Sequence, residues 1–214
     1  MSKPQLVKRY TLFMIGIIAN AVGVAITTKS SLGTTPISSV PYVLSLIFPL
    51  SFGTFTFFLN LLMVIGQLLL LKRDFPRIQY FQLAATVVFS GFIDLTMLLL
   101  QPVYFPHYYW QVLFLLLGCA ILGLGICLEV FANVMYIPGE GLVRAITRKL
   151  SREFGTVKIG FDVSLVIGAL LISWLCLNHV EGIREGTVVG ALLVGLMARF
   201  FMKTLRPLKM WFYR

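Results

Sequence analysis

Charged side chains interrupt the apolar stretches of this chain at a few positions, and these positions are where chemistry can occur. They are Asp94, Glu129, Glu140, Lys158, Asp162 and Arg199. A charge near the centre of a bilayer costs about 2.5–3.5 kcal/mol on insertion scales, so it is usually paired or functional. An acidic group that titrates at such a position could bind a solute or couple transport to protons.

The spacing of these residues predicts which of them can meet. Lys158 and Asp162 are four residues apart, so they share one face of a helix. We expect a substrate or proton site lined by Glu140, Asp162 and Asn60, with Glu129, Lys158 and Arg199 in the same inner half of the membrane. Asp94 falls toward the outer end of its span. The alternative is an ion-pair network that only fixes helix packing.

Other chemistries have no support in the sequence. The two histidines, His107 and His179, lie at the outer ends of spans, far apart for a metal site. No zinc-protease motif, nucleophile elbow or phosphate-binding glycine loop occurs. We therefore expect no metal, no cofactor and no enzymatic activity, with an intramembrane enzyme and a simple channel as lesser alternatives.

The elements that must position these residues are membrane-spanning helices. Of the 214 residues, 58% are hydrophobic and 12% are charged, whereas a soluble domain carries about 25% charged residues. Six apolar runs are long enough to cross a bilayer: residues 10–28, 53–71, 79–100, 110–131, 157–178 and 186–203. The chain is therefore expected to be an all-α membrane protein with one integral membrane domain over residues 1–214.

Basic residues predict the orientation. Fifteen fall on alternate connections: Lys3, Lys8, Arg9, Lys72, Arg73, Arg77, Arg144, Arg148, Lys149, Arg152, Lys158, Lys203, Arg206, Lys209 and Arg214. The positive-inside rule then places both termini in the cytoplasm. The basic residues that give the chain its net charge of +10 flank the spans and do not line one folded face. This distribution excludes nucleic acid as a partner and favours anionic lipid. The C-terminal Trp211, Phe212 and Tyr213 are expected to be interface anchors.

The two halves of the chain resemble each other at a constant offset of 102 residues. The matches are Gly16 with Gly118, Gly23 with Gly125, Pro36 with Pro138, and Phe-Gly-Thr at 52–54 with the same residues at 154–156; Asn60 falls opposite Asp162. Each half, about 10–100 and about 110–203, holds three spans. Because three is odd, the halves predict two inverted repeats, as in many secondary transporters.

The connections after the first and fourth spans are predicted to be broken or re-entrant segments. Residues 31–48 carry no charge and include Gly33 and Pro36. Pro138, Gly139 and Gly141 surround Glu140 at a helix start, where the helix dipole favours a carboxylate. After them, the basic residues Arg144, Arg148, Lys149 and Arg152 occupy one side of an amphipathic helix, which is expected to face lipid at the cytoplasmic surface.

At these residues the sequence resembles the YczE/YitT group of bacterial integral membrane proteins. The resemblance rests on Ser-Leu-Gly-x-x-Pro at 31–36, Pro-Gly-Glu-Gly-Leu at 138–142, Phe-Gly-Thr-Val-Lys at 154–158 with Asp162, and Gly-Thr at 186–187. It implies a bacterial plasma-membrane protein with a small multi-spanning fold, and it implies no activity. The group is usually drawn with five spans, so the six predicted here depart from it.

Two functions remain in view. The inverted repeats, broken segments and sparse buried charges favour a secondary transporter or permease for a small solute. The small size favours instead an accessory or regulatory membrane protein that binds a partner or lipid. An enclosed polar cavity at the membrane midplane would distinguish the two. The charge of the solute and the oligomeric state, which includes a possible homodimer, stay open.

Overall fold

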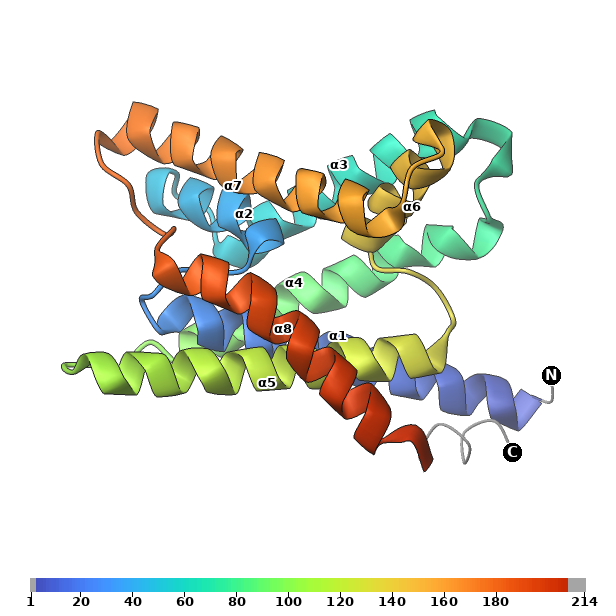
Figure 1. Cartoon of the computed structure of the whole chain (residues 1–214), viewed down its shortest axis with the longest axis horizontal. Coiled ribbons are helices and arrows are strands. Elements are labelled where there is room, and N and C mark those ends of the chain that lie inside the picture. The colour runs from blue at the N-terminus through green and yellow to red at the C-terminus, as the bar shows by residue number, and fades with distance from the viewer. Residues whose placement is uncertain (1–2, 208–214) are drawn as a thin grey trace.

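The computed structural model describes residues 3–207, and all its regular elements are helices (Figure 1). They are α1 (Lys3–Lys29), α2 (Pro36–Ile47), α3 (Phe52–Leu71), η1 (Lys72–Asp74), η2 (Arg77–Phe81), α4 (Gln82–Leu99), α5 (Tyr108–Ala132), α6 (Pro138–Leu150), α7 (Phe154–Leu177) and α8 (Glu185–Thr204). Six helices are long and apolar enough to cross a membrane, namely α1, α3, α4 (with η2), α5, α7 and α8. The six predicted spans are therefore confirmed.

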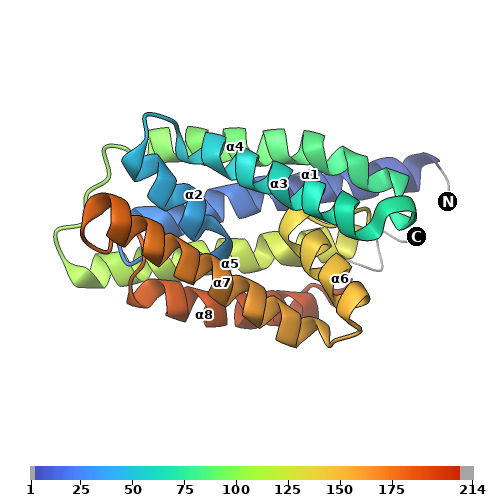
Figure 2. The same cartoon turned by 90° about the horizontal axis from the view of Figure 1, so that it is seen from above.

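The C-terminal residues used for the orientation and interface predictions lie outside the described range. They are Lys209, Trp211, Phe212, Tyr213 and Arg214. Within the described range, α1 begins and α8 ends at the same end of the bundle (Figures 1 and 2). We call this the terminal end.

The helices form two layers (Figures 1 and 2). In the first layer α4 packs on α1, α1 on α5 and α5 on α8. In the second, α2 packs on α7 and α3, and α6 packs on α3 and α7. The contact of α3 with α4 joins the layers along one side of the molecule.

The seam between α1 and α5 is a close backbone contact made by glycines. A Cβ atom built on Gly16 would lie 3.0 Å from the carbonyl oxygen of Gly125, and one on Gly23 would lie 3.0 Å from that of Gly118. Small residues allow transmembrane helices to approach this closely, which gains van der Waals contact where lipid offers no hydrophobic driving force. Among the helices of residues 3–207, this pair has the most extensive contact.

The two expected broken segments are short helices that begin at the expected prolines. Pro36 and Pro138 occupy the first turns of α2 and α6, where a missing N–H costs nothing. A Cβ on Gly139 would lie 3.0 Å from Cδ1 of Ile37, so the first turns of α2 and α6 adjoin. Before α2, Gly33 has a φ of +115°, a conformation that glycine adopts without the steric cost of a Cβ.

Asp94 ties α4 to the start of α3. Its Oδ1 accepts a hydrogen bond from the backbone N–H of Gly53 at 2.7 Å, and its Oδ2 accepts one from Oγ of Ser51 at 2.6 Å. A carboxylate at a helix start satisfies an orphan donor and interacts favourably with the helix dipole. These bonds hold the start of α3 against the last part of α4, at the end of the hairpin opposite the η1–η2 connection.

The α7–α8 hairpin lacks such a closure. The N-cap residue of α7, Glu153, makes no side-chain capping bond, and α8 carries no acidic residue between Gly186 and Thr204. Beyond their connection, α7 and α8 do not pack along each other. They diverge toward the terminal end, one in each layer (Figure 1). The layers are therefore joined on the α3–α4 side and separate on the α7–α8 side.

The glycine seam predicts a position-specific effect on stability. A Cβ on Gly125 would lie 2.4 Å from Oδ1 of Asn20 and 2.8 Å from the Gly16 carbonyl oxygen, whereas a Cβ on Gly195 meets nothing within 4 Å. We expect Gly125→Ala to lower the free energy of unfolding by about 1–3 kcal/mol through overpacking. Gly195→Ala is the matched control, and helix propensity should raise its stability by up to ~1 kcal/mol. Thermal unfolding in detergent measures both, and equal effects would contradict the tight seam.

Candidate functional site

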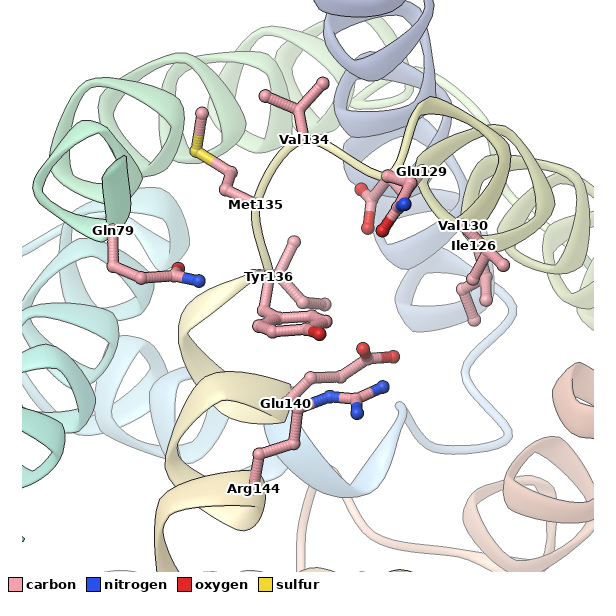
Figure 3. A pocket seen from close by; sticks show the side chains of 11 residues that line it. Gln79, Ile126, Glu129, Val130, Val134, Met135, Tyr136, Glu140 and Arg144 are labelled. Carbon is pink, nitrogen blue, oxygen red and sulfur yellow. The ribbon is translucent and has the colours of Figure 1, made fainter. Parts of the chain in front are cut away.

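A cavity of about 210 Å³ lies where α5 ends and α6 begins (Figure 3). The end of α5 lies toward the terminal end of the bundle (Figure 1). Its polar lining residues are Gln79, Glu129, Asn133, Tyr136, Glu140 and Arg144, and the remaining wall is apolar. The cavity is partly open and lies near one end of the bundle, not enclosed at mid-height. It is the place where the structure gathers acidic side chains from different helices.

Glu129 enters the cavity from the last turn of α5. Its side chain is 9% exposed, and Nδ2 of Asn20 on α1 donates a hydrogen bond to its Oε1 at 2.7 Å. A Cβ on Gly16 would lie 2.9 Å from Cγ of Glu129, so the close α1–α5 seam holds this carboxyl in place. No ion pair with Glu129 occurs among residues 3–207.

Arg9 positions the end of α5. Its Nε donates to the carbonyl oxygen of Ala132 at 2.6 Å, and one terminal nitrogen donates to that of Asn133 at 2.5 Å. Asn133 adopts a left-handed conformation with φ of 45°, and its N–H bonds the carbonyl of Glu129. Asparagine tolerates this C-terminal conformation. A guanidinium on the last carbonyls also balances the negative end of the helix dipole.

Glu140 comes from the first turn of α6, after Pro138. Burial raises the pKa of this carboxyl above its ordinary value, and the charges of Arg144 and Lys158 oppose that shift in part. Arg144 stacks its guanidinium on the ring of Tyr136, 4.1 Å from its centroid, and on Phe154 at 5.1 Å. The positive charge of Arg144 is thus held between aromatic rings beside the cavity.

The other expected site residues lie elsewhere. Lys158 and Asp162 form an ion pair on α7 at 2.5 Å and do not line the cavity. Asn60 on α3 is 7% exposed and makes no hydrogen bond with residues 3–207. Arg199 is exposed on α8. Asp94 caps α3 at the opposite end, so the cavity unites Glu129 with Glu140 and excludes Asp94.

The sequence reasoning missed a chain of buried amides beside the site. Nε2 of Gln67 donates to Oε1 of Gln82 and to the carbonyl of Pro138, both at 3.1 Å. Gln82 also hydrogen-bonds Gln79, which lines the cavity. Together with Asn20, these amides tie α1, α3 and α4 to the ends of α5 and α6. Their presence in or beside apolar spans was the available signal, because membrane-buried amides usually bond across helices.

The basic side of α6 is largely exposed. Arg148 forms an ion pair with Asp74 at 2.9 Å, while Lys149 and Arg152 are exposed. The opposite side, which includes Gly141 and Val143, is buried. Leu142 lies 3.1 Å from the Cβ position of Gly66 on α3. The helix is therefore amphipathic and rests on the second layer.

Fold and site together define an α-helical membrane protein with several spans and a small acidic cavity near one end. The chain belongs to a family of unknown function (DUF6198), whose model matches residues 7–203. It is 28% identical over 199 residues to the uncharacterized membrane protein YczE of Bacillus subtilis (strain 168), covering 92% of this chain and 87% of that protein. No solved structure matches the chain. The resemblance to YczE is confirmed.

The half-buried carboxyl of Glu140 predicts a pH-dependent stability. Because its pKa is raised in the folded protein, the folded state keeps this proton to higher pH than the unfolded state does. Its contribution to stability is present below the ordinary pKa of 4.5 and is lost as pH rises through the raised value. Glu140→Gln should therefore gain stability relative to wild type at pH 8 and differ little at pH 4.

Thermal unfolding of both proteins across this pH range measures the difference. The pKa of the exposed His179 is also raised, chiefly by its hydrogen bond with Glu181. That contribution has the same sign but is common to both proteins, so it cancels in the comparison. Glu153→Gln removes an exposed carboxyl at the same end and should leave the pH profile unchanged. Identical profiles for Glu140→Gln and wild type would contradict the burial of Glu140.

Proposed function

We propose that this membrane protein is a secondary transporter or permease for a small solute, which binds in the cavity between Glu129 and Glu140. The observation that carries the proposal is the unequal closure of two hairpins in a bundle whose acidic cavity is lined by η2, the end of α5 and the start of α6. Asp94 holds α3 and α4 together, whereas α7 and α8 diverge toward the end where the cavity lies. The cavity is not the enclosed midplane cavity expected for a transporter. An alternating-access transporter that is open to one side would instead have a partly open cavity toward that side.

Contacts across the α1–α5 seam support inverted repeats. Gly16 meets Gly125 while Gly23 meets Gly118, and at the offset of 102 residues each of these contacts is the counterpart of the other. Likewise Gly16 meets Glu129, and Gly118 meets Thr27. Reciprocal contacts of this kind are typical of a two-fold axis. A site near such an axis is the arrangement that inverted-repeat transporters use.

The broken helices supply the second support. The adjoining first turns of α2 and α6 lie within the second layer, and neither N-cap residue makes a side-chain capping bond. Discontinuous helices of transporters present their N-termini and unwound backbone to the solute. Here Glu140 sits in the first turn of α6, beside the cavity.

In the proposed cycle the two hairpins exchange roles. Separation of α3 from α4 would open the end that Asp94 now closes, and packing of α7 on α8 would close the terminal end. The α1–α5 seam would stay intact as the fixed element. With both termini in the cytoplasm of a bacterial plasma membrane, the state seen here faces inward, and Lys149 and Arg152 meet anionic lipid.

A second candidate is an accessory role, in which α7 binds another membrane protein. Its buried side chains are Ala169 and Ser173, and Cβ atoms on Gly160 and Gly168 would meet nothing within 4 Å. Exposed small residues on an apolar helix favour helix–helix association. A second copy of the chain in a homodimer would cover the same face of α7.

Cysteine labelling distinguishes a moving hairpin from a static one. We would place single cysteines at Thr56 or Thr27 in a variant whose three native cysteines are replaced by alanine. Thr56 is 4% exposed on α3 near the Asp94 closure, and Thr27 is 1% exposed in the α1–α5 seam. If the hairpins exchange, a water-soluble maleimide should label Thr56→Cys slowly and leave Thr27→Cys unmodified.

Weakening the hydrogen bonds of Asp94 that close the α3–α4 hairpin gives a second, more specific comparison of labelling rates. Adding Asp94→Asn should speed labelling at position 56 by about tenfold, because weakening two charge-assisted hydrogen bonds by ~1.4 kcal/mol shifts the closed–open equilibrium by that factor. Labelling at position 27 should not change. No labelling at position 56 with or without Asp94→Asn argues for a static protein and the accessory role. Equal acceleration at both positions would indicate general unfolding.

A further inference from the structure

The cavity holds two acidic side chains and few cations to balance them. Figure 3 shows Glu129 and Glu140 pointing into the same space from α5 and from α6. Neither forms an ion pair with a residue of 3–207. Glu129 has one polar partner, the amide of Asn20.

Three cations beside the cavity, or on the helices next to it, are each engaged by other groups. Arg9 bonds the carbonyl oxygens of Ala132 and Asn133. Lys158 on α7 pairs with Asp162, and Arg144 stacks on Tyr136 and Phe154.

The other elements around the pair bring neutral groups. The α1 helix presents Asn20, and η2 presents the amide of Gln79. The α8 helix packs on α5 through Met197 and Ala198, next to Gly123. Arg144 and Lys158 offset part of the charge of Glu140 without forming an ion pair with it. Two carboxylates in one small cavity still repel each other and resist desolvation, so such a pair holds a proton or a cation.

We propose that the cavity binds a small cationic solute whose one charged group is an ammonium, and that this solute exchanges with a proton held by Glu129 or Glu140. In the exchange the O–H bond of the protonated carboxyl breaks and the proton leaves to water. The resulting carboxylate then pairs with the ammonium, which enters with its charge intact. One positive charge leaves and one arrives, so the net charge of the site is unchanged. The inference rests on the proposed transport function and names its solute class.

The walls of the cavity limit the size and polarity of the part of the solute that carries no charge. Ile126, Val130 and Ile137 offer aliphatic surface, and Tyr136 offers an aromatic face. The volume of about 210 Å³ is below the roughly 300–1,000 Å³ typical of drug-sized ligands. A short apolar body therefore fits. An anion attracted to Arg144 would meet two carboxyl groups, which disfavours anionic solutes.

A matched set of four-carbon probes tests the charge requirement. The full chain in lipid nanodiscs would be titrated by calorimetry with butylamine, butanol, butyrate and 4-aminobutyrate at pH 6, 7 and 8. We expect butylamine to bind and butanol and butyrate not to bind. Its affinity should rise about tenfold per pH unit where one proton is exchanged. Heats measured in buffers of different ionisation enthalpy should show that proton's release.

Two isosteric variants locate the site. Glu129→Gln keeps an acceptor for Asn20, and Glu140→Gln keeps the side-chain shape; each should weaken butylamine binding at least about tenfold at pH 8, the loss of one ion pair of ~1.4 kcal/mol or more. Each should also reduce the proton release. Glu153→Gln, an exposed carboxyl outside the cavity, should match wild type. If Glu129→Gln does not fold, Glu140→Gln alone decides the test.

Three results would overturn the assignment. Butyrate binding in preference to butylamine, lost in Arg144→Gln, would show an anion site. Preference for 4-aminobutyrate over butylamine, also lost in Arg144→Gln, would show a zwitterion site. Butylamine binding without pH dependence would rule out the proposed exchange with a proton. In each case labelling at Thr56→Cys still reports on the hairpin movement that the transport cycle requires, so the solute class can fail while the proposed function stands.

Discussion

The close contact of α1 with α5 is the interaction on which the rest of the structure depends. Inside a bilayer, apolar surface gains little by leaving lipid, so helices associate through backbone approach and hydrogen bonds. Glycines at 16, 23, 118 and 125 permit that approach. The contact brings Asn20 to Glu129, and Arg9 to the carbonyls that end α5. The α1–α5 contact therefore positions Glu129 and the end of α5, which form one wall of the acidic cavity.

The second determinant is the unequal bonding of the two hairpins. Asp94 satisfies donors at the start of α3 and links that helix to α4. The corresponding start of α7 has Glu153 as its N-cap residue, and its side chain makes no capping bond. These two charge-assisted hydrogen bonds add to the packing of α3 on α4 and are each stronger than a neutral hydrogen bond. This difference explains why the layers meet on the α3–α4 side and separate on the other.

The site places one buried acidic group, Glu129, at the end of a membrane-spanning helix, and a half-buried one, Glu140, beside it. Glu140 gains from its position at a helix start, where the dipole is positive, and Glu129 gains one amide hydrogen bond. These interactions are modest beside the cost of burying two charges. The buried amides of Gln67, Gln79 and Gln82 show the contrasting case, in which polar groups satisfy one another. Groups that remain unpaired in a cavity are the ones free to bind a solute.

The sequence by itself determined the six spans, because about twenty consecutive apolar residues have no other stable environment than the membrane core. It also determined where α2 and α6 begin, since Pro36 and Pro138 suit the first helical turn. It marked Glu129 and Glu140 as costly charges, and it paired Lys158 with Asp162 through their spacing of four. Each of these follows from local chemistry or helical period.

Only the tertiary structure decided which marked residues share a cavity. Asp94 carries the same kind of charge as Glu129, yet it caps α3 far from the site, and Arg199 is exposed on α8. The amide chain through Gln67 joins residues from distant parts of the sequence. Helical periodicity shows which side chains share one face of a helix. The crossing of helices, set by contacts such as those of the four seam glycines, decides which other face they meet.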